Sequence, residues 1–265
     1  MIVLRFKNAP SSKPPKIWEV PSLGVFILKR RRFNMSTAIL VDGGFYLKRA
    51  QFLWGNKSPE DRAKELFTYC LKHLNDKNEE RKLYRIFFYD CPPSTKKVYH
   101  PLLKKTVDLG KSDLYSWANE FHNHLREKRK MALRLGLLND NKLHYTLSSN
   151  ALNKLCRGEI TTSDFNESDF KLSVEQKGVD MRIGLDIASI SYKRQVERIV
   201  LVSGDSDFVP AAKLARREGM EFVLDPMWAS IKPDLQEHID RLRSTFPKPQ
   251  KHHATETTEY TVDEG

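Results

Sequence analysis

The sequence predicts a three-layer α/β/α sandwich, in which a mainly parallel central sheet lies between two layers of helices. Short apolar runs of the length of a strand recur along the chain, and amphipathic helical patterns separate them. Apolar runs without polar alternation are typical of strands that are buried on both faces of a parallel sheet. Strands that alternate with helices form βαβ units, which build this class of fold.

Four apolar runs are the predicted central strands, at residues 38–41, 84–89, 199–202 and 221–224. Three of them end in, or just before, an aspartate: Asp42, Asp90 and Asp225. The remaining strand runs into the segment 203–207, which contains two further aspartates. In residues 170–174, apolar and polar side chains alternate, and this predicts an exposed edge strand.

Helices are predicted at residues 59–75, 112–136, 179–192, 208–218 and 233–242. Ser58 and Pro59 form a capping start for the first helix, and Gly219 is a suitable stop for the fourth. In the second helix, apolar residues recur at steps of three or four, which is the pattern of an amphipathic helix. The third is mostly apolar and is predicted to be buried.

The net charge of +11 is concentrated near the N-terminus. Residues 1–34 contain eight basic residues and one acidic residue, so they carry +7, and residues 35–265 carry +4. Four prolines interrupt this basic segment. We expect residues 1–34 to be an extension, or a mis-assigned start, outside a domain at 35–246. Residues 247–265 are polar and are predicted to be a disordered tail.

The composition also excludes several classes of protein. With 40% hydrophobic and 30% charged residues, the chain is neither wholly disordered nor collagen-like. Its apolar runs are shorter than the ~18 residues of a membrane helix, so no membrane partner is expected. Three widely spaced cysteines without a CxxC pair argue against a disulfide framework or a cysteine-rich zinc site, and they favour a reducing, cytoplasmic location.

Aspartates gather at the predicted carboxyl ends of the strands, where ligands bind in such sheets. Taken singly, each has a structural explanation: Asp42 shapes a turn, Asp207 caps a helix, and Asp180 lies in a first helical turn. Together with Asp90 and Asp205, however, they would repel one another. A hard cation such as Mg²⁺ or Mn²⁺ relieves this repulsion, and it can activate water for phosphodiester hydrolysis.

Other polar residues near these aspartates are candidates for supporting roles. Lys177, just before the helix at 179, could orient a phosphate or could simply be solvated. Ser203 and Ser206 flank Asp205 and could hold water or metal ligands, although serine caps explain them equally well. Asp186 lies about 240° around the helix from Asp180, so we expect it to pair with a buried partner instead.

Four segments in order resemble the NYN domain family of PIN-like nucleases, in its LabA-type branch. They are Val41-Asp42-Gly43-Gly44, Phe88-Tyr89-Asp90-Cys91-Pro92-Pro93, Gln176-Lys177-Gly178-Val179-Asp180-Met181-Arg182 and Val202-Ser203-Gly204-Asp205-Ser206-Asp207-Phe208-Val209-Pro210. The resemblance covers about residues 36–242. It implies a PIN-like fold and hydrolysis of RNA, single-stranded in the first instance, with Mg²⁺ or Mn²⁺. It also leaves open a homodimer, which is plausible for PIN-like domains.

By this resemblance, the catalytic and metal-binding residues are Asp42, Asp180, Asp205 and Asp207, with Asp90 and Lys177 nearby. One position departs from the family pattern: Phe45 stands where many relatives have an asparagine shortly after the first aspartate. The alternative hypothesis is therefore an RNA-binding or regulatory module with weak or no catalysis. Basic segments such as 126–130 and Lys96-Lys97 could then bind phosphates, or they could be solvated faces.

Three other enzyme classes do not fit the sequence. A haloacid-dehalogenase phosphatase needs a second aspartate two residues after the first, and Gly44 stands there. A P-loop enzyme needs GxxxxGK[ST], which does not occur, and a dinucleotide-binding site lacks GxGxxG after the first strand.

Overall fold

The computed structural model describes residues 35–76 and 79–248, so the predicted N-terminal extension and the tail from 249 onward lie outside the described residues. Six strands form one sheet, in which every neighbouring pair is parallel. In spatial order they are β14 (Arg241–Leu242), β13 (Glu221–Asp225), β12 (Arg198–Val202), β1 (Ser36–Asp42), β4 (Lys82–Asp90) and β7 (Met131–Leu135). The four predicted central strands are confirmed.

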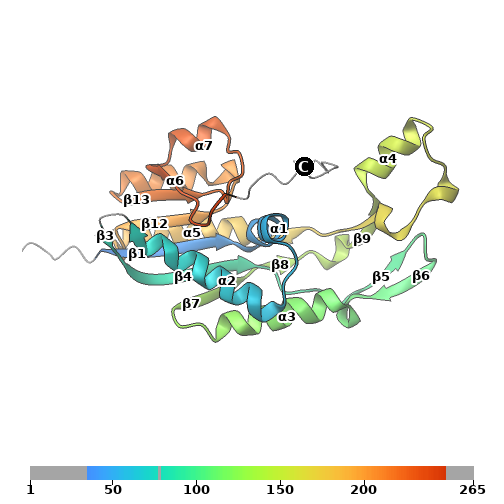
Figure 1. Cartoon of the computed structure of the whole chain (residues 1–265), viewed down its shortest axis with the longest axis horizontal. Coiled ribbons are helices and arrows are strands. Elements are labelled where there is room, and N and C mark those ends of the chain that lie inside the picture. The colour runs from blue at the N-terminus through green and yellow to red at the C-terminus, as the bar shows by residue number, and fades with distance from the viewer. Residues whose placement is uncertain (1–34, 77–78, 249–265) are drawn as a thin grey trace, which may run out of the picture. The chain divides into compact units, whose positions relative to one another are not determined.

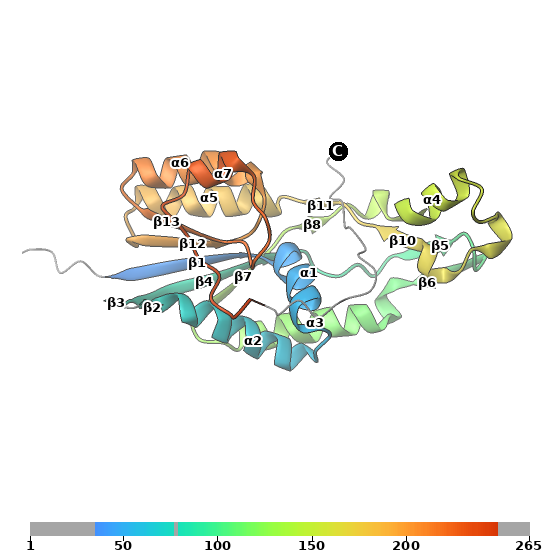
Figure 2. The same cartoon turned by 45° about the horizontal axis from the view of Figure 1, so that its top comes forward.

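Helices cover both faces of this sheet, as Figures 1 and 2 show. One face packs against α5 (Val179–Tyr192), α6 (Val209–Arg217) and α7 (Pro233–Glu237), and the other against α1 (Gly43–Trp54), α2 (Pro59–Leu71) and α3 (Asp113–Arg126). Alternate residues of a strand point to opposite faces, so Ala38 and Leu40 contact the first layer, while Ile39 and Val41 contact the second. The three-layer α/β/α prediction is thereby confirmed.

The order of the strands creates a switch point beside β1. From β1 the chain builds outward through β4 and β7, and it then returns to place β12 on the other side of β1, followed by β13 and β14. In open parallel sheets, ligands bind at the carboxyl ends of the strands where the direction of building reverses. The carboxyl ends of β1 and β12 are therefore the favoured position for a site.

Three sequence predictions need correction. The helix predicted at 112–136 ends at Arg126, and residues 131–135 form the edge strand β7 after a turn in which Lys130 has a φ of 61°. The helix predicted at 233–242 ends at Glu237, because Arg241 and Leu242 pair with β13. The helix α1 was not predicted at all. The remaining predicted helices lie close to their predicted bounds. Among the described residues, no helix is long and apolar enough to cross a membrane.

Residues 92–111 and 137–177 form an insertion lobe, which extends beyond the carboxyl ends of β1 and β4 in both views (Figures 1 and 2). The lobe contains a hairpin of β5 (Lys97–His100) and β6 (Lys105–Asp108), and the helix α4 (Ser149–Cys156). It also holds the antiparallel pairs β9 (His144–Leu147) with β10 (Phe170–Ser173), and β8 (Leu137–Leu138) with β11 (Gln176–Lys177). A further short pair, β2 (Asn75–Asp76) and β3 (Glu79–Glu80), lies outside the lobe. The edge strand predicted at 170–174 is β10.

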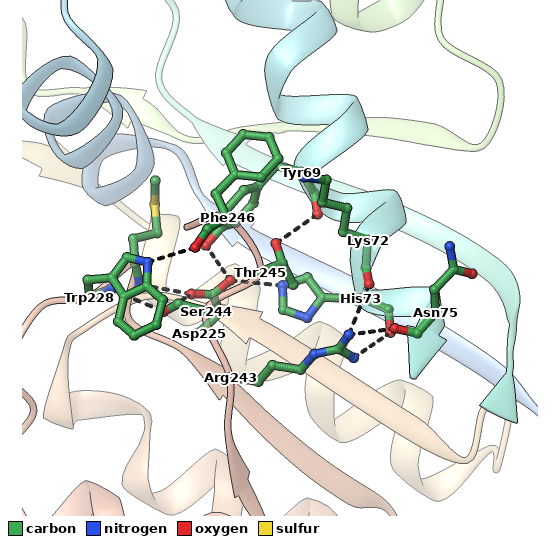
Figure 3. Close-up of polar contacts among 11 residues, drawn as sticks. Tyr69, Lys72, His73, Asn75, Asp225, Trp228, Arg243, Ser244, Thr245 and Phe246 are labelled. Carbon is green, nitrogen blue, oxygen red and sulfur yellow. Dashed lines mark hydrogen bonds and ion pairs between the residues drawn. The ribbon is translucent and has the colours of Figure 1, made fainter. Parts of the chain in front are cut away.

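A buried carboxylate joins the sheet to α2 and to the C-terminal segment (Figure 3). Asp225, which ends β13, is fully buried and accepts hydrogen bonds from the Tyr69 hydroxyl at 2.5 Å, His73 Nε2 at 2.8 Å and Ser244 Oγ at 2.9 Å. Burial and the neighbouring carboxylate raise the pKa of Tyr69, which keeps the hydroxyl protonated as a donor. Asp225 therefore has a structural role that differs from that of the other strand-end aspartates.

The junction between β1 and α1 requires glycine at position 43. A Cβ there would clash with the Tyr89 carbonyl oxygen and approach the Phe88 ring to 2.8 Å. We expect Gly43→Ala to lower the free energy of unfolding by about 3 kcal/mol in urea denaturation, because the backbone oxygen cannot move aside. The matched control is Gly184→Ala in α5, where the added methyl meets open space. This change should stabilise the protein by roughly 1 kcal/mol, and equal effects of the two variants would contradict the argument.

Candidate functional site

The carboxylate of Asp42 is held at the switch point by the start of α1. Asp42 ends β1 on the same side of the sheet as Ala38 and Leu40, so its side chain points toward the layer of α5 and α6. It is the N-cap of α1, where Oδ1 accepts the backbone N–H of Phe45 at 3.1 Å. Asp42 therefore has the structural role at the turn that its position in the sequence suggested. The hydrogen bond from Phe45 holds its carboxylate in place.

Ser203 connects Asp42 to the loop that follows β12. Its side chain is fully buried; Oγ donates to Asp42 Oδ2 at 3.3 Å and accepts the backbone N–H of Asp205 at 3.3 Å. Asp205 in turn caps the short 3-10 helix Ser206–Phe208 by accepting the N–H of Asp207 at 2.9 Å. Ser203 thus links Asp42 to the backbone of Asp205, and Ser206 and Asp207 follow in the 3-10 helix that Asp205 caps.

The fourth aspartate comes from the start of α5. Gly178 precedes this helix with a φ of 76°, a conformation that favours glycine, and Asp180 lies in the first turn. Lys177 is exposed, and its backbone pairs with Leu137 in the two-stranded sheet of β8 and β11. The insertion lobe therefore leads directly into the turn that carries Asp180.

The charges of Asp42, Asp180, Asp205 and Asp207, hereafter the acid cluster, influence one another. The pKa of Asp42 is raised to about 6, mainly by burial, with further increases from Asp180 and Asp205. The hydrogen bonds from Phe45 and Ser203 oppose this increase. The pKa of Asp180 is also raised, by burial and then by Asp205 and Asp207. Asp42 thus lies within electrostatic range of Asp180 and Asp205, and Asp180 within range of Asp205 and Asp207.

The donors of the acid cluster suit a hard divalent cation. All are carboxylate oxygens, and the neighbouring charges that raise the pKa of Asp42 and Asp180 belong to other carboxylates. Mg²⁺ binds such oxygens and usually keeps several waters, so it needs only one or two direct carboxylates. Within residues 35–76 and 79–248, the one group of three side chains with ligand atoms within 4.8 Å of one another lies elsewhere, at Asp234, Glu237 and His238. Among the described residues, no three carboxylates of the acid cluster therefore offer oxygens within that distance of one another.

Asp90 lies apart from the acid cluster, although it ends the neighbouring strand. It shares the strand face of Ile86 and Phe88, which is the face opposite to that of Asp42. Its Oδ2 lies 2.8 Å from His122 Nε2 in α3, and Oδ1 accepts the N–H of Cys91 at 2.8 Å. Asp186 likewise has a separate partner, the Tyr89 hydroxyl at 2.7 Å, as its helical phase predicted.

Phe45 occupies a packing position beside the acid cluster. A Cβ on Gly204 would lie 2.9 Å from Phe45 Cε2, so the ring lies directly against the loop between Ser203 and Asp205. The side chain that replaces the asparagine of the family pattern therefore supports this loop by contact.

The site residues predicted from the sequence did not include Gln176, a polar side chain near Asp42. Gln176 Oε1 and Asp42 Oδ1 both lie within 3.7 Å of the position that a Cβ on Gly44 would take. In the sequence, the only signal for Gln176 is that it directly precedes the segment from Lys177 to Asp180. Its amide oxygen adds a neutral oxygen donor beside the acid cluster.

Comparison with known proteins gives one family. The family model of the NYN domain matches residues 107–244. Among solved structures, the chain is similar to a protein of unknown function from Vibrio parahaemolyticus, with 16% identity and a TM-score of 0.41, over 80% of this chain and 93% of the other. A search of curated proteins finds no match.

Proposed function

Because the chain belongs to the NYN domain family of PIN-like nucleases, we propose that it hydrolyses RNA with the help of Mg²⁺ or Mn²⁺. The observation that carries this proposal is the acid cluster at the switch point of the sheet, where mutual repulsion and burial raise the pKa of Asp42 to about 6. A cation at this position would stabilise the ionised carboxylates and attract the phosphodiester of the substrate.

Each member of the site has a role in this proposal. Asp42, Asp180, Asp205 and Asp207 hold the cation, while Ser203 orients Asp42 through its hydrogen bond. When bound, the cation would lower the pKa of a water and offset charge on the scissile phosphate. The exposed Lys177, three residues before Asp180, would bind an adjoining phosphate.

Finer features of the proposal have separate support. The order of the four quoted segments supports the LabA-type branch, and the free cysteines Cys70, Cys91 and Cys156 are compatible with a reducing cytoplasm. Met181, Leu185 and Tyr192 are exposed on α5 at helical spacing, which supports a homodimer. Single-stranded RNA is the proposed substrate, because its bases and phosphates are both accessible to a protein surface.

The decisive experiment compares cleavage of a labelled single-stranded RNA by the wild type and by Asp205→Asn, in Mn²⁺, in Mg²⁺ and in a chelator. The wild type should cleave only with metal, and Asp205→Asn should lose at least about 100-fold in rate. Glu120→Gln, on the exposed side of α3, is the matched control and should retain full activity. Cleavage that persists in the chelator would contradict the proposal.

A second candidate function is RNA binding without turnover. The packing of Phe45 against Gly204 favours it, since an apolar ring stands where relatives offer a polar side chain. Salt-sensitive RNA binding by the wild type, with no cleavage in either metal, would select this candidate.

A further inference from the structure

The insertion lobe contains a cavity of about 390 Å³, and none of the four aspartates of the acid cluster lines it. It lies between the β5–β6 hairpin and the β9–β10 pair, and His100, Tyr145 and Phe170 contribute aromatic side chains to its lining. Lys105 and Glu167 place opposite charges on the same lining. The cavity therefore combines flat apolar surfaces with two polar groups, which is typical of a small-ligand site.

The aromatic side chains are held in place before any ligand binds. His100 is 4% exposed, and its ring centroid lies 4.3 Å from that of Tyr145 and 5.5 Å from that of Phe170. His100 Nδ1 accepts the backbone N–H of Leu103 at 3.3 Å, so in the neutral ring Nε2 carries the proton. Tyr145 and Phe170 lie on the β9–β10 pair and pack against His100 of β5, so three strands order these rings and lower the entropic cost of binding a flat ligand.

The lining of the cavity holds one lysine, Lys105, which can contact a phosphate, and one acid, Glu167. On the hairpin, Lys105 pairs directly with His100, so the two side chains share the face that lines the cavity. Residues 92–111 contain five lysines and one acidic residue. A lysine at the mouth of an aromatic cavity is suited to a phosphate whose attached base lies on the rings. Glu167 can accept hydrogen bonds from the amino and imino groups of a base such as guanine.

We propose that this cavity binds one unpaired nucleobase of the RNA, stacked on Tyr145 and Phe170, with Lys105 at its phosphate and Glu167 at its edge. The proposal rests on the proposed function, because it takes RNA as the ligand. From Phe170 the chain reaches Asp180 in ten residues, a span of at most ~35 Å. An RNA strand anchored in the lobe is therefore long enough to extend to the acid cluster.

The test measures binding of labelled single-stranded 12-mers to the full chain in a chelator, which separates binding from cleavage. Tyr145→Leu keeps an apolar side chain but removes the stacking surface, and it should weaken binding about 10-fold. Tyr99→Leu is the matched control: Tyr99 lies in the same lobe, on β5 rather than β9, is 58% exposed, and points to the face of the hairpin opposite to that of His100. Tyr99→Leu should bind as the wild type does.

Two further variants keep the test informative if Tyr145→Leu disturbs the lobe. Lys105→Gln should reduce the slope of log affinity against log salt by about 0.7, the loss of one phosphate contact. Glu167→Gln should reduce the preference for a guanine-containing 12-mer over oligo(U). A fully paired duplex should compete poorly, because its bases are stacked inside the helix.

The possible results distinguish a failure of the cavity proposal from a failure of the nuclease proposal. Unchanged binding and unchanged KM in Tyr145→Leu, or a loss of binding in Tyr99→Leu alone, would overturn the role of the cavity while leaving metal-dependent cleavage intact. Binding that depends on Tyr145 without any cleavage in Mn²⁺ would support the cavity and overturn the nuclease. Absence of binding to any 12-mer would overturn the cavity, and the cleavage assay would then decide the nuclease independently.

Discussion

Asp42→Asn is expected to abolish metal-dependent RNA cleavage and, at the same time, to stabilise the metal-free protein. Asparagine is a good N-cap, so its side chain can still accept the N–H of Phe45 and preserve the start of α1. It cannot supply the charge that a cation requires, and cleavage should fall by at least about 100-fold. The activity and the stability therefore change in opposite directions at this one residue.

The stability gain has a defined pH dependence. Burial raises the pKa of Asp42 in the folded state to about 6, above its ordinary value of 3.8, so the ionised carboxylate destabilises the fold. The penalty is absent below pH 3.8, develops as the pH rises to 6 and is complete above it. The difference of about two pKa units corresponds to roughly 3 kcal/mol at neutral pH.

Urea unfolding at pH 4 to 8 in a chelator measures this effect. The free energy of unfolding of Asp42→Asn should exceed that of the wild type above pH 6, and the two should converge near pH 4. Glu120→Gln should follow the wild type at every pH. Addition of Mg²⁺ should raise the stability of the wild type more than that of Asp42→Asn. Parallel pH curves for wild type and Asp42→Asn would show that the carboxylate is not destabilised by burial.

Asp225→Ala should cause the largest loss of stability, about 3–5 kcal/mol. The substitution removes the acceptor of the Tyr69 hydroxyl, His73 Nε2 and Ser244 Oγ, as Figure 3 shows, and also that of the Met227 N–H at 2.8 Å. Buried donors that lose their acceptor bear the full cost of desolvation.

Thermal unfolding of the full chain provides the measurement for Asp225. Asp234→Ala, on the exposed side of α7, is the control, and it should change the free energy of unfolding by less than about 0.5 kcal/mol. A small effect of Asp225→Ala would mean that water replaces the carboxylate and that the network does not join α2 to the sheet.

The sequence predicts the central sheet well, because its strands are buried on both faces and therefore read as continuous apolar runs. The edge strand β7 was mistaken for a continuation of α3, since Met131, Ala132 and Leu133 are good helix formers. Its pairing with β4, a contact between distant parts of the chain, overrides this local preference. The helix α1 was missed because Gly43 and Gly44 at its start read as a turn.

The sequence predicts which aspartates lie near the carboxyl ends of the strands, but not how they are arranged. Strand-end positions identified Asp42 and Asp205 as neighbours, while Asp90 ends a neighbouring strand in the same way. Asp90 differs from Asp42 because its side chain points to the other face of the sheet. This face depends on the register between β1 and β4, which shifts between Thr37 and Ala38. Such an irregularity leaves no clear mark in the sequence. The cavity of the lobe was invisible because its strands are only four residues long.

The central position of β1 has a consequence for the order of events during synthesis. β1 can pair with β4 early, but its other edge pairs with β12, where Thr37 lies beside Arg198, about 160 residues later. At ribosomal speeds of ~5–20 residues per second, this edge stays open for roughly 10–30 s. Ser203 and Asp205 follow β12 directly, so the acid cluster assembles only as that gap closes. While this edge of β1 is unpaired, the nascent chain exposes an apolar strand and has no complete acid cluster. The pairing of β12 with β1 covers the edge and completes the cluster in one late step.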